Sequence, residues 1–260
     1  MMSKRSVKYD GLPVSPQAVP TGILSARHQD ADYLYIDFAA EGYTAGGYNS
    51  QTPSLSADGS AYLVFRNHKL LLYSATAQSA TPTRGGVGID IAVDNVDDEA
   101  VELVAVNPWF TIGTDPGFFL EVTLSIDVVA GTDDFFVGFR KNAATQNTSW
   151  ATYTDYFGLG LVAADGALNI REQLNDAGET ATDTTDTLSN NTVHTFRVEV
   201  TDAGVCTAQI DGAAPTVTSA FTFDTGDQVN AAIYLLQDTT TTDNAWLRTM
   251  EIGRLGREHG

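Results

Sequence analysis

Apolar and polar residues alternate along much of the chain with a period of two. In residues 120–128, Leu, Val, Leu, Ile and Val take every second position, and Glu, Thr, Ser and Asp lie between them. Residues 33–38 and 87–93 show shorter runs of the same kind. This pattern is typical of strands with one face in the core and one in water, and no window shows the 3.6-residue period of an amphipathic helix. The sequence therefore predicts an all-β chain.

Turn residues separate these runs. Asp202-Ala203-Gly204 joins residues 195–201 to 205–211 and predicts a three-residue hairpin loop with Gly204 in a left-handed conformation. The threonine-rich stretches 180–187 and 239–242 are interpreted as polar loops. Further strands are expected at residues 61–66, 69–74, 135–139, 157–162, 167–172, 232–237 and 246–253. About twelve to fourteen short strands with regular turns predict a two-sheet antiparallel jelly-roll sandwich.

Residues 1–30 differ from the rest because prolines forbid a helix and favour an extended arm. The arm residues expected to contact a partner are Lys4, Arg5, Lys8, Pro13, Pro16 and Pro20. Residues 31–260 are predicted to form one sandwich domain, which at this size needs no disulfide; the single cysteine, Cys206, allows none within the chain. No apolar stretch follows the basic start, and no window has the ~18 apolar residues of a membrane span, so we expect neither a secretory signal nor a membrane partner.

The acidic residues are concentrated in the body of the chain. The net charge is −19, and residues 86–247 hold 4 basic and 25 acidic residues, a net of −21 that leaves +2 for the two ends. A body this acidic repels phosphate backbones, so nucleic acid is not an expected partner. The charge serves solubility, or the basic ends dock on an acidic partner.

Residues 194–212 resemble a segment common in laminin-G-like and concanavalin A-like lectin/glucanase domains, in which a His begins a strand, an alternating run leads to a Gly hairpin, and a second run ends in Asp-Gly. The matching residues are His194, Phe196, Val198, Val200, Gly204, Ala208, Ile210, Asp211 and Gly212. Residues 246–253 are similar to the closing strand of that family, which pairs beside the first strand. The resemblance spans residues 33–256 and implies a concanavalin A-like jelly roll; its motifs concern strands and turns, so it says little about activity.

Carboxylate spacing argues against glycoside hydrolysis. A retaining enzyme needs two carboxyl groups ~5–5.5 Å apart. Glu121 and Asp127 share a strand face but are separated by roughly 20 Å, which suits neither a retaining nor an inverting pair. The other acidic candidates are Asp97, Asp98, Glu99 and Glu102, but residues 94–99 are interpreted as a turn between strands and the charge run as solvated. The resemblance leaves calcium as a possibility, although the spacing does not match an EF-hand, and no other cofactor is expected.

Other reactive residues have structural interpretations. His194 is expected to begin a strand and make a structural hydrogen bond, and no histidine pair has zinc-binding spacing. Cys206 is in phase with Ala208 and Ile210, so we expect a buried side chain and not a nucleophile. No catalytic residue is assigned.

Aromatic residues in loops are the remaining candidates for binding. Tyr43 and Tyr48 lie in a Gly-rich loop, and Trp150 and Tyr153 lie in a loop that runs up to a strand. Such rings stack on sugars or anchor protein interfaces, and burial in the core is the alternative fate of aromatic side chains.

Two functional hypotheses follow. In style the chain resembles virion proteins of tailed bacteriophages: it is acidic, rich in Ala, Thr, Asp and Gly, and has an arm before a jelly roll. This resemblance implies a non-enzymatic capsid decoration or cement protein on the capsid surface, made in the host cytoplasm. It would bind the major capsid protein or other virion proteins, as a homo-oligomer such as a trimer. The alternative is a carbohydrate-binding, lectin-like module; a glycoside hydrolase or lyase would need two carboxylates in one cleft.

Overall fold

A computed structural model describes residues 8–9, 12–13, 33–38, 60–65, 68–74, 84–85, 87–92, 100–145, 149–237 and 244–256. Sheet I consists, in spatial order, of β13 (Thr180–Thr187), β12 (Ala167–Gln173), β11 (Tyr156–Leu161), β10 (Thr132–Lys141), β17 (Gln228–Gln237), β8 (Ala100–Thr111), β5 (His68–Ser74) and β4 (Ser60–Phe65). Sheet II consists of β16 (Phe221–Thr222), β15 (Val205–Ile210), β14 (His194–Val200), β9 (Phe118–Ile126), β18 (Ala245–Arg254), β7 (Gly88–Asp90) and β6 (Arg84–Gly85), with β3 (Leu34–Asp37) beside β18.

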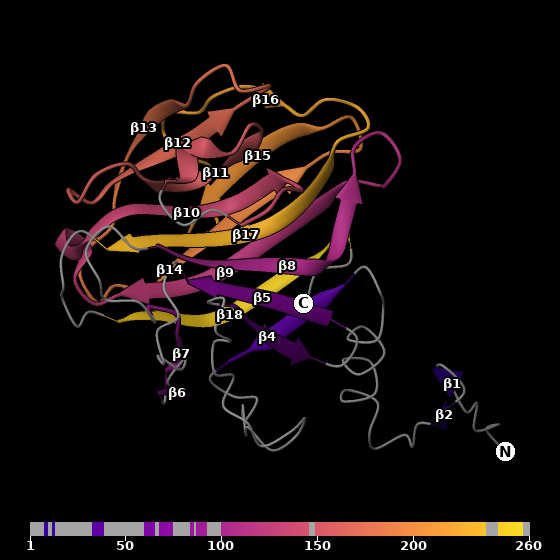
Figure 1. Ribbon diagram of the computed structural model, residues 1–260, viewed down its shortest axis with the longest axis horizontal. Helices are drawn as coiled ribbons and strands as arrows, with labels where there is room; N and C mark the ends of the chain where they lie inside the picture. Colours follow the sequence, from indigo (N-terminus) through magenta and orange to yellow (C-terminus); the bar gives the residue numbers. More distant parts are fainter. Residues whose placement is uncertain are drawn as a thin grey trace, which may run out of the picture.

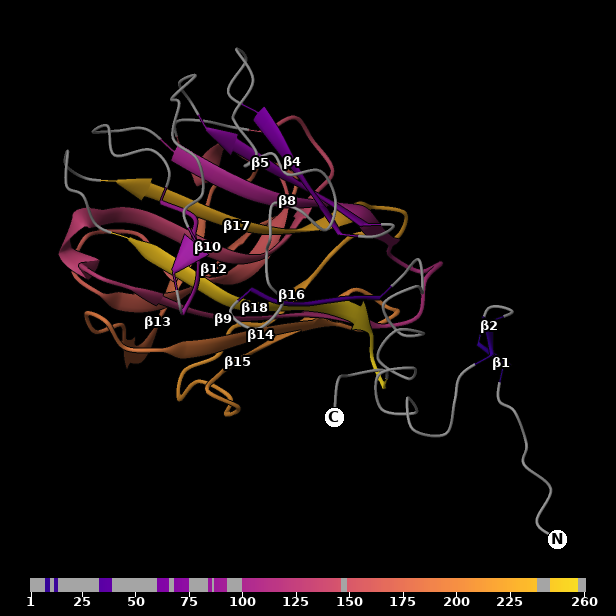
Figure 2. The same cartoon turned by 90° about the horizontal axis from the view of Figure 1, so that it is seen from below.

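The two sheets pack face to face as a jelly-roll sandwich (Figure 1). Figure 2 shows β8, β17 and β10 in one layer and β9, β18 and β14 in the other. Neighbouring strands pair antiparallel throughout the described residues. The helical segments in this part of the chain are short 3-10 turns, such as η2 (Val129–Gly131) and η3 (Trp150–Thr152). The predicted all-β, two-sheet fold is confirmed.

An apolar core fills the space between the sheets, because alternate residues of each strand face inward. Phe118 of β9 stacks on Phe110 of β8 with ring centroids 4.1 Å apart, and it meets the edge of Phe139 of β10 at 5.0 Å. Phe135 of β10 lies 5.9 Å from Phe196 of β14. Each fully buried ring contributes roughly 2–3 kcal/mol by leaving water. These aromatic contacts join sheet I to sheet II.

The hairpin on which the family resemblance rests is confirmed. β14 and β15 pair antiparallel, and Gly204 in their loop has a φ of 84°. His194 begins β14 and its Nδ1 lies 2.9 Å from Asp211 Oδ2, so it makes the expected structural contact. Cys206 is buried, and burial raises the pKa of its thiol well above the usual value. The closing strand β18 pairs with β3, as the resemblance implied.

The prediction that residues 180–187 form a polar loop is wrong. Residues 180–187 are not a loop but strand β13, which pairs with β12. The hydroxyl of Thr184 is buried and donates to the carbonyl of Leu168 at 2.6 Å, which fixes this Thr- and Asp-rich strand to the sheet edge. Residues 239–242 lie outside the described residues.

Part of the predicted arm is described. β1 (Lys8–Tyr9) and β2 (Leu12–Pro13) form a two-stranded antiparallel pair in which Lys8 lies opposite Pro13. Lys4, Arg5, Pro16 and Pro20 lie outside the described residues. In the part of the chain that the structure describes, no helix is long and apolar enough to cross a membrane.

Candidate functional site

The outer face of sheet I carries polar and charged side chains where a solvent-facing sheet would expose them, yet they are buried. Because Phe135, Val137 and Phe139 of β10 face the core, Arg140 is directed to the opposite face. Arg171 of β12 is placed outward in the same way, and both arginines are fully or almost fully buried. Something must therefore cover this face.

Residues 149–155, between β10 and β11, cover the part of it around Arg140. The Trp150 indole stacks on Phe136 of β10 at 4.0 Å and lies 5.4 Å from the Tyr234 ring of β17. The facing glycines Gly138 and Gly158 leave room for Phe136, since a Cβ on Gly158 would lie 2.6 Å from its ring. Glycine at position 158 therefore permits close packing. The result is a second, aromatic cluster outside the main core.

The first arginine group joins β8 and β10 to the covering segment. Arg140 Nε donates to Glu102 Oε1 at 2.7 Å, and the Tyr153 hydroxyl donates to Glu102 Oε2 at 2.5 Å. The Arg140 guanidinium also lies over the Tyr153 ring, 4.3 Å from its centroid. Glu102 is fully buried, so the interpretation of the charge run as solvated is wrong for this residue, and Asp97, Asp98 and Glu99 lie outside the described residues. Its buried charge is offset by Arg140.

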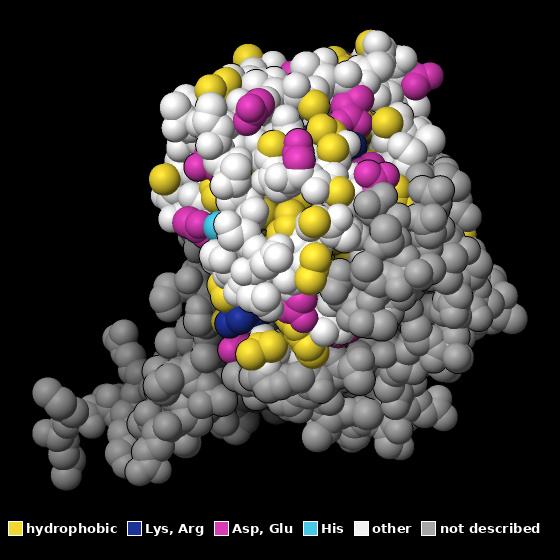
Figure 3. All heavy atoms as spheres, turned by 90° about the vertical axis from the view of Figure 1, so that its left-hand side faces the viewer, with side chains coloured by type: hydrophobic (Ala, Val, Ile, Leu, Met, Phe, Trp, Pro, Cys, Tyr) yellow, Lys and Arg dark blue, Asp and Glu magenta, His cyan; other side chains and the backbone are white. Residues whose placement is uncertain are grey.

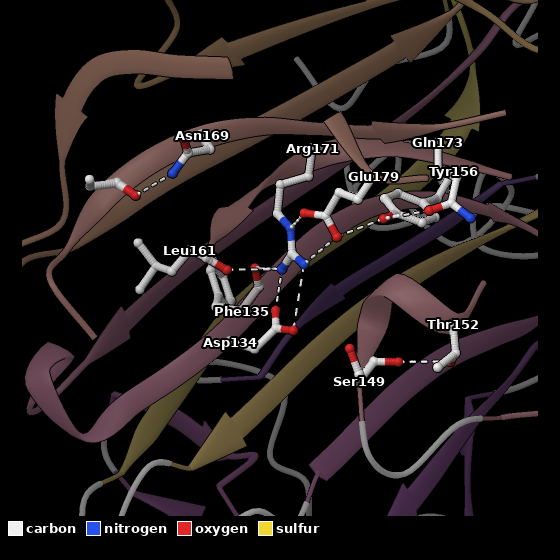
Figure 4. Close-up of polar contacts among 11 residues, drawn as sticks. Asp134, Phe135, Ser149, Thr152, Tyr156, Leu161, Asn169, Arg171, Gln173 and Glu179 are labelled. Atoms are coloured by element: carbon white, nitrogen blue, oxygen red, sulfur yellow. Dashed lines mark hydrogen bonds and ion pairs between the residues drawn. The ribbon is translucent and has the colours of Figure 1, made fainter. Parts of the chain in front are cut away.

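The second arginine group lies over β10, β11 and β12 (Figure 4). Arg171 is ion-paired with Asp134 and donates to both oxygens of Glu179 at 2.8 and 2.9 Å. The Tyr156 hydroxyl donates to Glu179 Oε2 at 2.7 Å. Burial acts to raise the pKa of Glu179, but the hydrogen bonds from Arg171 and Tyr156 and the charge of Arg171 together outweigh it and hold this pKa below its usual value. Burial dominates at Asp134 and raises its pKa.

Beyond these groups, three strand ends meet at one end of sheet I. Lys141 ends β10, Asp155 precedes β11, and Asp227 precedes β17. Because β10 pairs antiparallel with both β11 and β17, these three residues lie next to one another. Lys141 Nζ is 2.6 Å from Asp227 Oδ1 and 3.5 Å from Asp155 Oδ2. The hydrogen bond with Asp227 raises the pKa of Lys141 above its usual value.

Exposed polar residues surround this ion bridge. Asn175 follows β12, and its side-chain amide donates to Asp224 Oδ2 at 2.8 Å, while its backbone N–H donates to Asp155 Oδ1 at 2.9 Å. Asn175 and Asp224 are exposed, whereas Asp155 and Asp227 are buried. We name this set, Lys141, Asp155, Asn175, Asp224 and Asp227, the polar loop cluster. It presents carboxylate and amide groups to solvent from a rigid base.

The cluster suits hydrogen bonding to polyhydroxylated ligands better than metal binding. Carboxylates accept and amides donate and accept, as sugar hydroxyls require. Over the described residues, no group of three or more His, Cys, Asp or Glu side chains could hold a metal ion. The space between Asp155 and Asp227, where a cation would fit best by charge, is taken by the Lys141 ammonium. A calcium ion therefore does not fit between these two carboxylates.

Glu121 and Asp127, whose spacing argues against a catalytic pair, make separate contacts in the structure. Glu121 of β9 is 3.2 Å from Arg197, whereas Asp127 accepts hydrogen bonds from Asn244 at 2.9 Å and from the Trp246 indole at 3.3 Å. The two carboxylates thus belong to different structural contacts on sheet II. This agrees with the spacing argument against a catalytic pair.

Of the predicted aromatic candidates, Trp150 and Tyr153 lie together beneath the surface, with 0% and 2% exposure. They are not a free sugar-stacking platform, and this half of the prediction is wrong: the rings pack on Phe136 and Arg140 instead. Tyr43 and Tyr48 lie outside the described residues. Sequence reasoning missed the polar loop cluster, whose only local signal was a set of turn-forming residues, Asn175-Asp176 and Asp224-Thr225-Gly226.

The described surface reflects the acidic composition. Figure 3 shows acidic side chains spread over one face, with few basic ones among them. In the polar loop cluster, three carboxylates are present with one ammonium. An anionic ligand would be repelled there.

No protein-family model matches the chain, and no curated protein matches it. Solved structures do share its fold. The potassium-bound form of the Emp46p carbohydrate recognition domain has a TM-score of 0.52 at 9% identity, over 84% of this chain and 94% of that one. A protein of unknown function, SO2946 from Shewanella oneidensis MR-1, has a TM-score of 0.52 at 14% identity, over 95% and 97% of the two chains. At these identities the similarity concerns the fold alone, and the fold is a concanavalin A-like jelly roll.

Proposed function

We propose that this chain is a carbohydrate-binding, lectin-like module that holds a glycan at the polar loop cluster. The observation that carries the proposal is the arrangement of that cluster: exposed Asn175 and Asp224 lie on a base formed by the buried Asp155 and Asp227, which the partly exposed Lys141 bridges. A preorganised set of donors and acceptors binds hydroxyl groups with little ordering cost. The fold shared with the Emp46p carbohydrate recognition domain supports this proposal.

The chemistry of the cluster favours a neutral or amino-bearing glycan. Three carboxylates with one ammonium repel uronates and other acidic sugars. The carboxylates on the outer face of sheet I lie outside this cluster, and Glu102, Asp134 and Glu179 are each paired with an arginine.

A glycan array tests the proposal. The full chain should give saturable binding to a subset of neutral or amino-bearing glycans, and Asn175→Ala combined with Asp224→Ala should weaken it at least about 10-fold, because two hydrogen-bonding side chains are lost. Thr207→Ala is the matched control, since Thr207 is exposed on β15 of the opposite sheet. Absence of any glycan binding, or equal loss with Thr207→Ala, would contradict the proposal.

The capsid-decoration hypothesis stays a prediction. Of the similar structures named above, one is a carbohydrate recognition domain and the other a protein of unknown function, and most of the arm residues on which the hypothesis rests lie outside the described residues. The expected major-capsid partner, the trimer and the capsid location are equally untested.

A further inference from the structure

The Lys141 ammonium lies where two buried carboxylates meet. Its Nζ is 2.6 Å from Asp227 Oδ1 and 3.5 Å from Asp155 Oδ2, and the two aspartate side chains are 9% and 1% exposed. The second oxygen of Asp227, Oδ2, is also buried and has no hydrogen-bond partner among the described residues. Two carboxylates that are shielded from water and lie within 4 Å of the same ammonium are stabilised in their charged form by that positive charge.

The protein fixes this positive charge from several sides. The Lys141 backbone N–H donates to the carbonyl of Asp155 at 2.8 Å, and the N–H of Asn142 donates to the carbonyl of Gln228 at 2.7 Å. Asp155 in turn accepts from the Thr154 hydroxyl at 2.6 Å. These contacts hold the backbone at the end of β10 beside Asp155 and β17, so the lysine stem starts within reach of both carboxylates.

We propose that Lys141 is a built-in cation that holds the polar loop cluster in its binding shape, so that the cluster works without a bound metal ion. It ties the end of β10 to the starts of β11 and β17, and through Asp227 it fixes the connection that carries Asp224. Lys141 is thus a positioning residue. Its role in ligand binding rests on the proposed function, whereas its role as the internal cation does not.

A second consequence follows from the same geometry. If the ammonium is removed, Asp155 and Asp227 become two unneutralised carboxylates with a free oxygen, Asp227 Oδ2, facing a shielded space. Such a pair attracts a hard cation from solution, with water supplying the remaining ligands. The lysine-free variant is therefore expected to gain calcium binding that the natural chain does not show at this cluster.

Thermal unfolding of Lys141→Met tests this without any glycan. Its Tm should fall by about 5–10 °C relative to the natural chain, and about 10 mM CaCl2 at constant ionic strength should recover several degrees, because calcium binds only the folded pair. Lys141→Arg retains a cation and should show neither effect. In Lys141→Met/Asp227→Asn the calcium response should disappear, since one carboxylate is gone.

Some results would overturn the proposal. These are a Tm of Lys141→Met equal to that of the natural chain, or a calcium response that is equal in Lys141→Met and in Lys141→Met/Asp227→Asn. If Lys141→Met does not fold, Lys141→Gln is measured in the same way, and folding of either variant only with CaCl2 supports the proposal.

A glycan-binding measurement separates this proposal from the proposed function. With a glycan identified on the array, the natural chain should bind it equally in EDTA, Lys141→Met should bind at least about 10-fold more weakly, and CaCl2 should restore part of that loss. Loss of binding by the natural chain in EDTA would refute the built-in cation while leaving the glycan module intact. If no glycan binds, the proposed function fails and the Tm comparison still decides the role of Lys141.

Discussion

The outer faces of the two sheets carry arginine–carboxylate pairs of the same chemistry, but their burial differs. On sheet I, the side chains of Arg140 and its partner Glu102 are 1% and 0% exposed. On sheet II, Arg197 is 14% exposed and its partners Glu121 and Glu199 are 35% and 28% exposed. Arg197 also lies over the Phe119 ring, 4.2 Å from its centroid, much as Arg140 lies over Tyr153.

The covering segment accounts for this difference. Trp150 and Tyr153 from residues 149–155 exclude water from the Arg140–Glu102 pair, whereas Arg197 and its carboxylate partners keep part of their surface in water. Excluding water makes an unpaired charge very costly, while a pair in water contributes little. The same pairs are thus essential on one face and nearly dispensable on the other.

The largest expected effect is that of breaking a pair on sheet I. Arg140→Met should lower the free energy of unfolding by about 3–5 kcal/mol, because Glu102 is left charged and buried without its counter-ion. Urea denaturation measures this loss. Arg140→Met/Glu102→Met is the control and should recover a large part of it. A loss below about 1 kcal/mol for the single variant would mean that water reaches Glu102 on the outer face of sheet I.

A buried carboxylate on sheet II, Asp90, tests whether burial itself decides the energetic effect of a charge on that sheet as well. Burial raises the pKa of Asp90 to about 6, against hydrogen bonds from the backbone N–H groups of Ala92 and Ala245. Because the folded state holds the proton more tightly than the unfolded state, stability should fall as the pH rises from about 4 to 6. Asp90→Asn removes the cost of ionising this buried carboxyl and keeps an oxygen acceptor. The substitution should therefore stabilise the protein at pH 7 by up to about 3 kcal/mol and have little effect at pH 4.

Denaturation of Asp90→Asn and the natural chain at several pH values between 4 and 7 checks this prediction. Asp202→Asn, at an exposed carboxylate in the β14–β15 loop, is the matched control and should leave the pH profile unchanged. An Asp90→Asn profile parallel to that of the natural chain would show that Asp90 does not carry the pH dependence.

The smallest effect is expected for the exposed pair. Arg197→Met should change the free energy of unfolding by no more than about 1 kcal/mol, since the charges of Glu121 and Glu199 remain hydrated. The difference should shrink further in high salt. A loss as large as that of Arg140→Met would remove the distinction between the two faces.

Strand prediction succeeded where one face is apolar and the other polar. The runs of β9 and of the β14–β15 hairpin have this pattern, and Gly204 marked the turn. β8 was not predicted, because Val101 and Leu103 face the core while Ala100 and Val104 pack into the aromatic cluster, so the alternation is lost. β13 was taken for a loop because Thr and Asp are typical of turns, although pairing with β12 satisfies its backbone.

Less of the candidate site was predictable. Trp150 and Tyr153 were correctly singled out, but whether they face solvent depends on Phe136 and Arg140, which lie on a strand packed beneath them. Lys141, Asp155 and Asp227 gave no joint signal, because 86 positions separate the first from the last. Only the antiparallel register of β10 with β11 and β17 brings them together.

The sequence by itself determined the strand-rich fold, the hairpin turn at Gly204 and the acidic character of the body, since alternation, turn chemistry and charge are local properties. The tertiary structure alone decided which charged side chains are buried and which contact water, and which distant loops share a site. Burial and ion pairing depend on contacts between residues far apart in the chain. For that reason the same arginine chemistry is buried at Arg140 and partly exposed at Arg197.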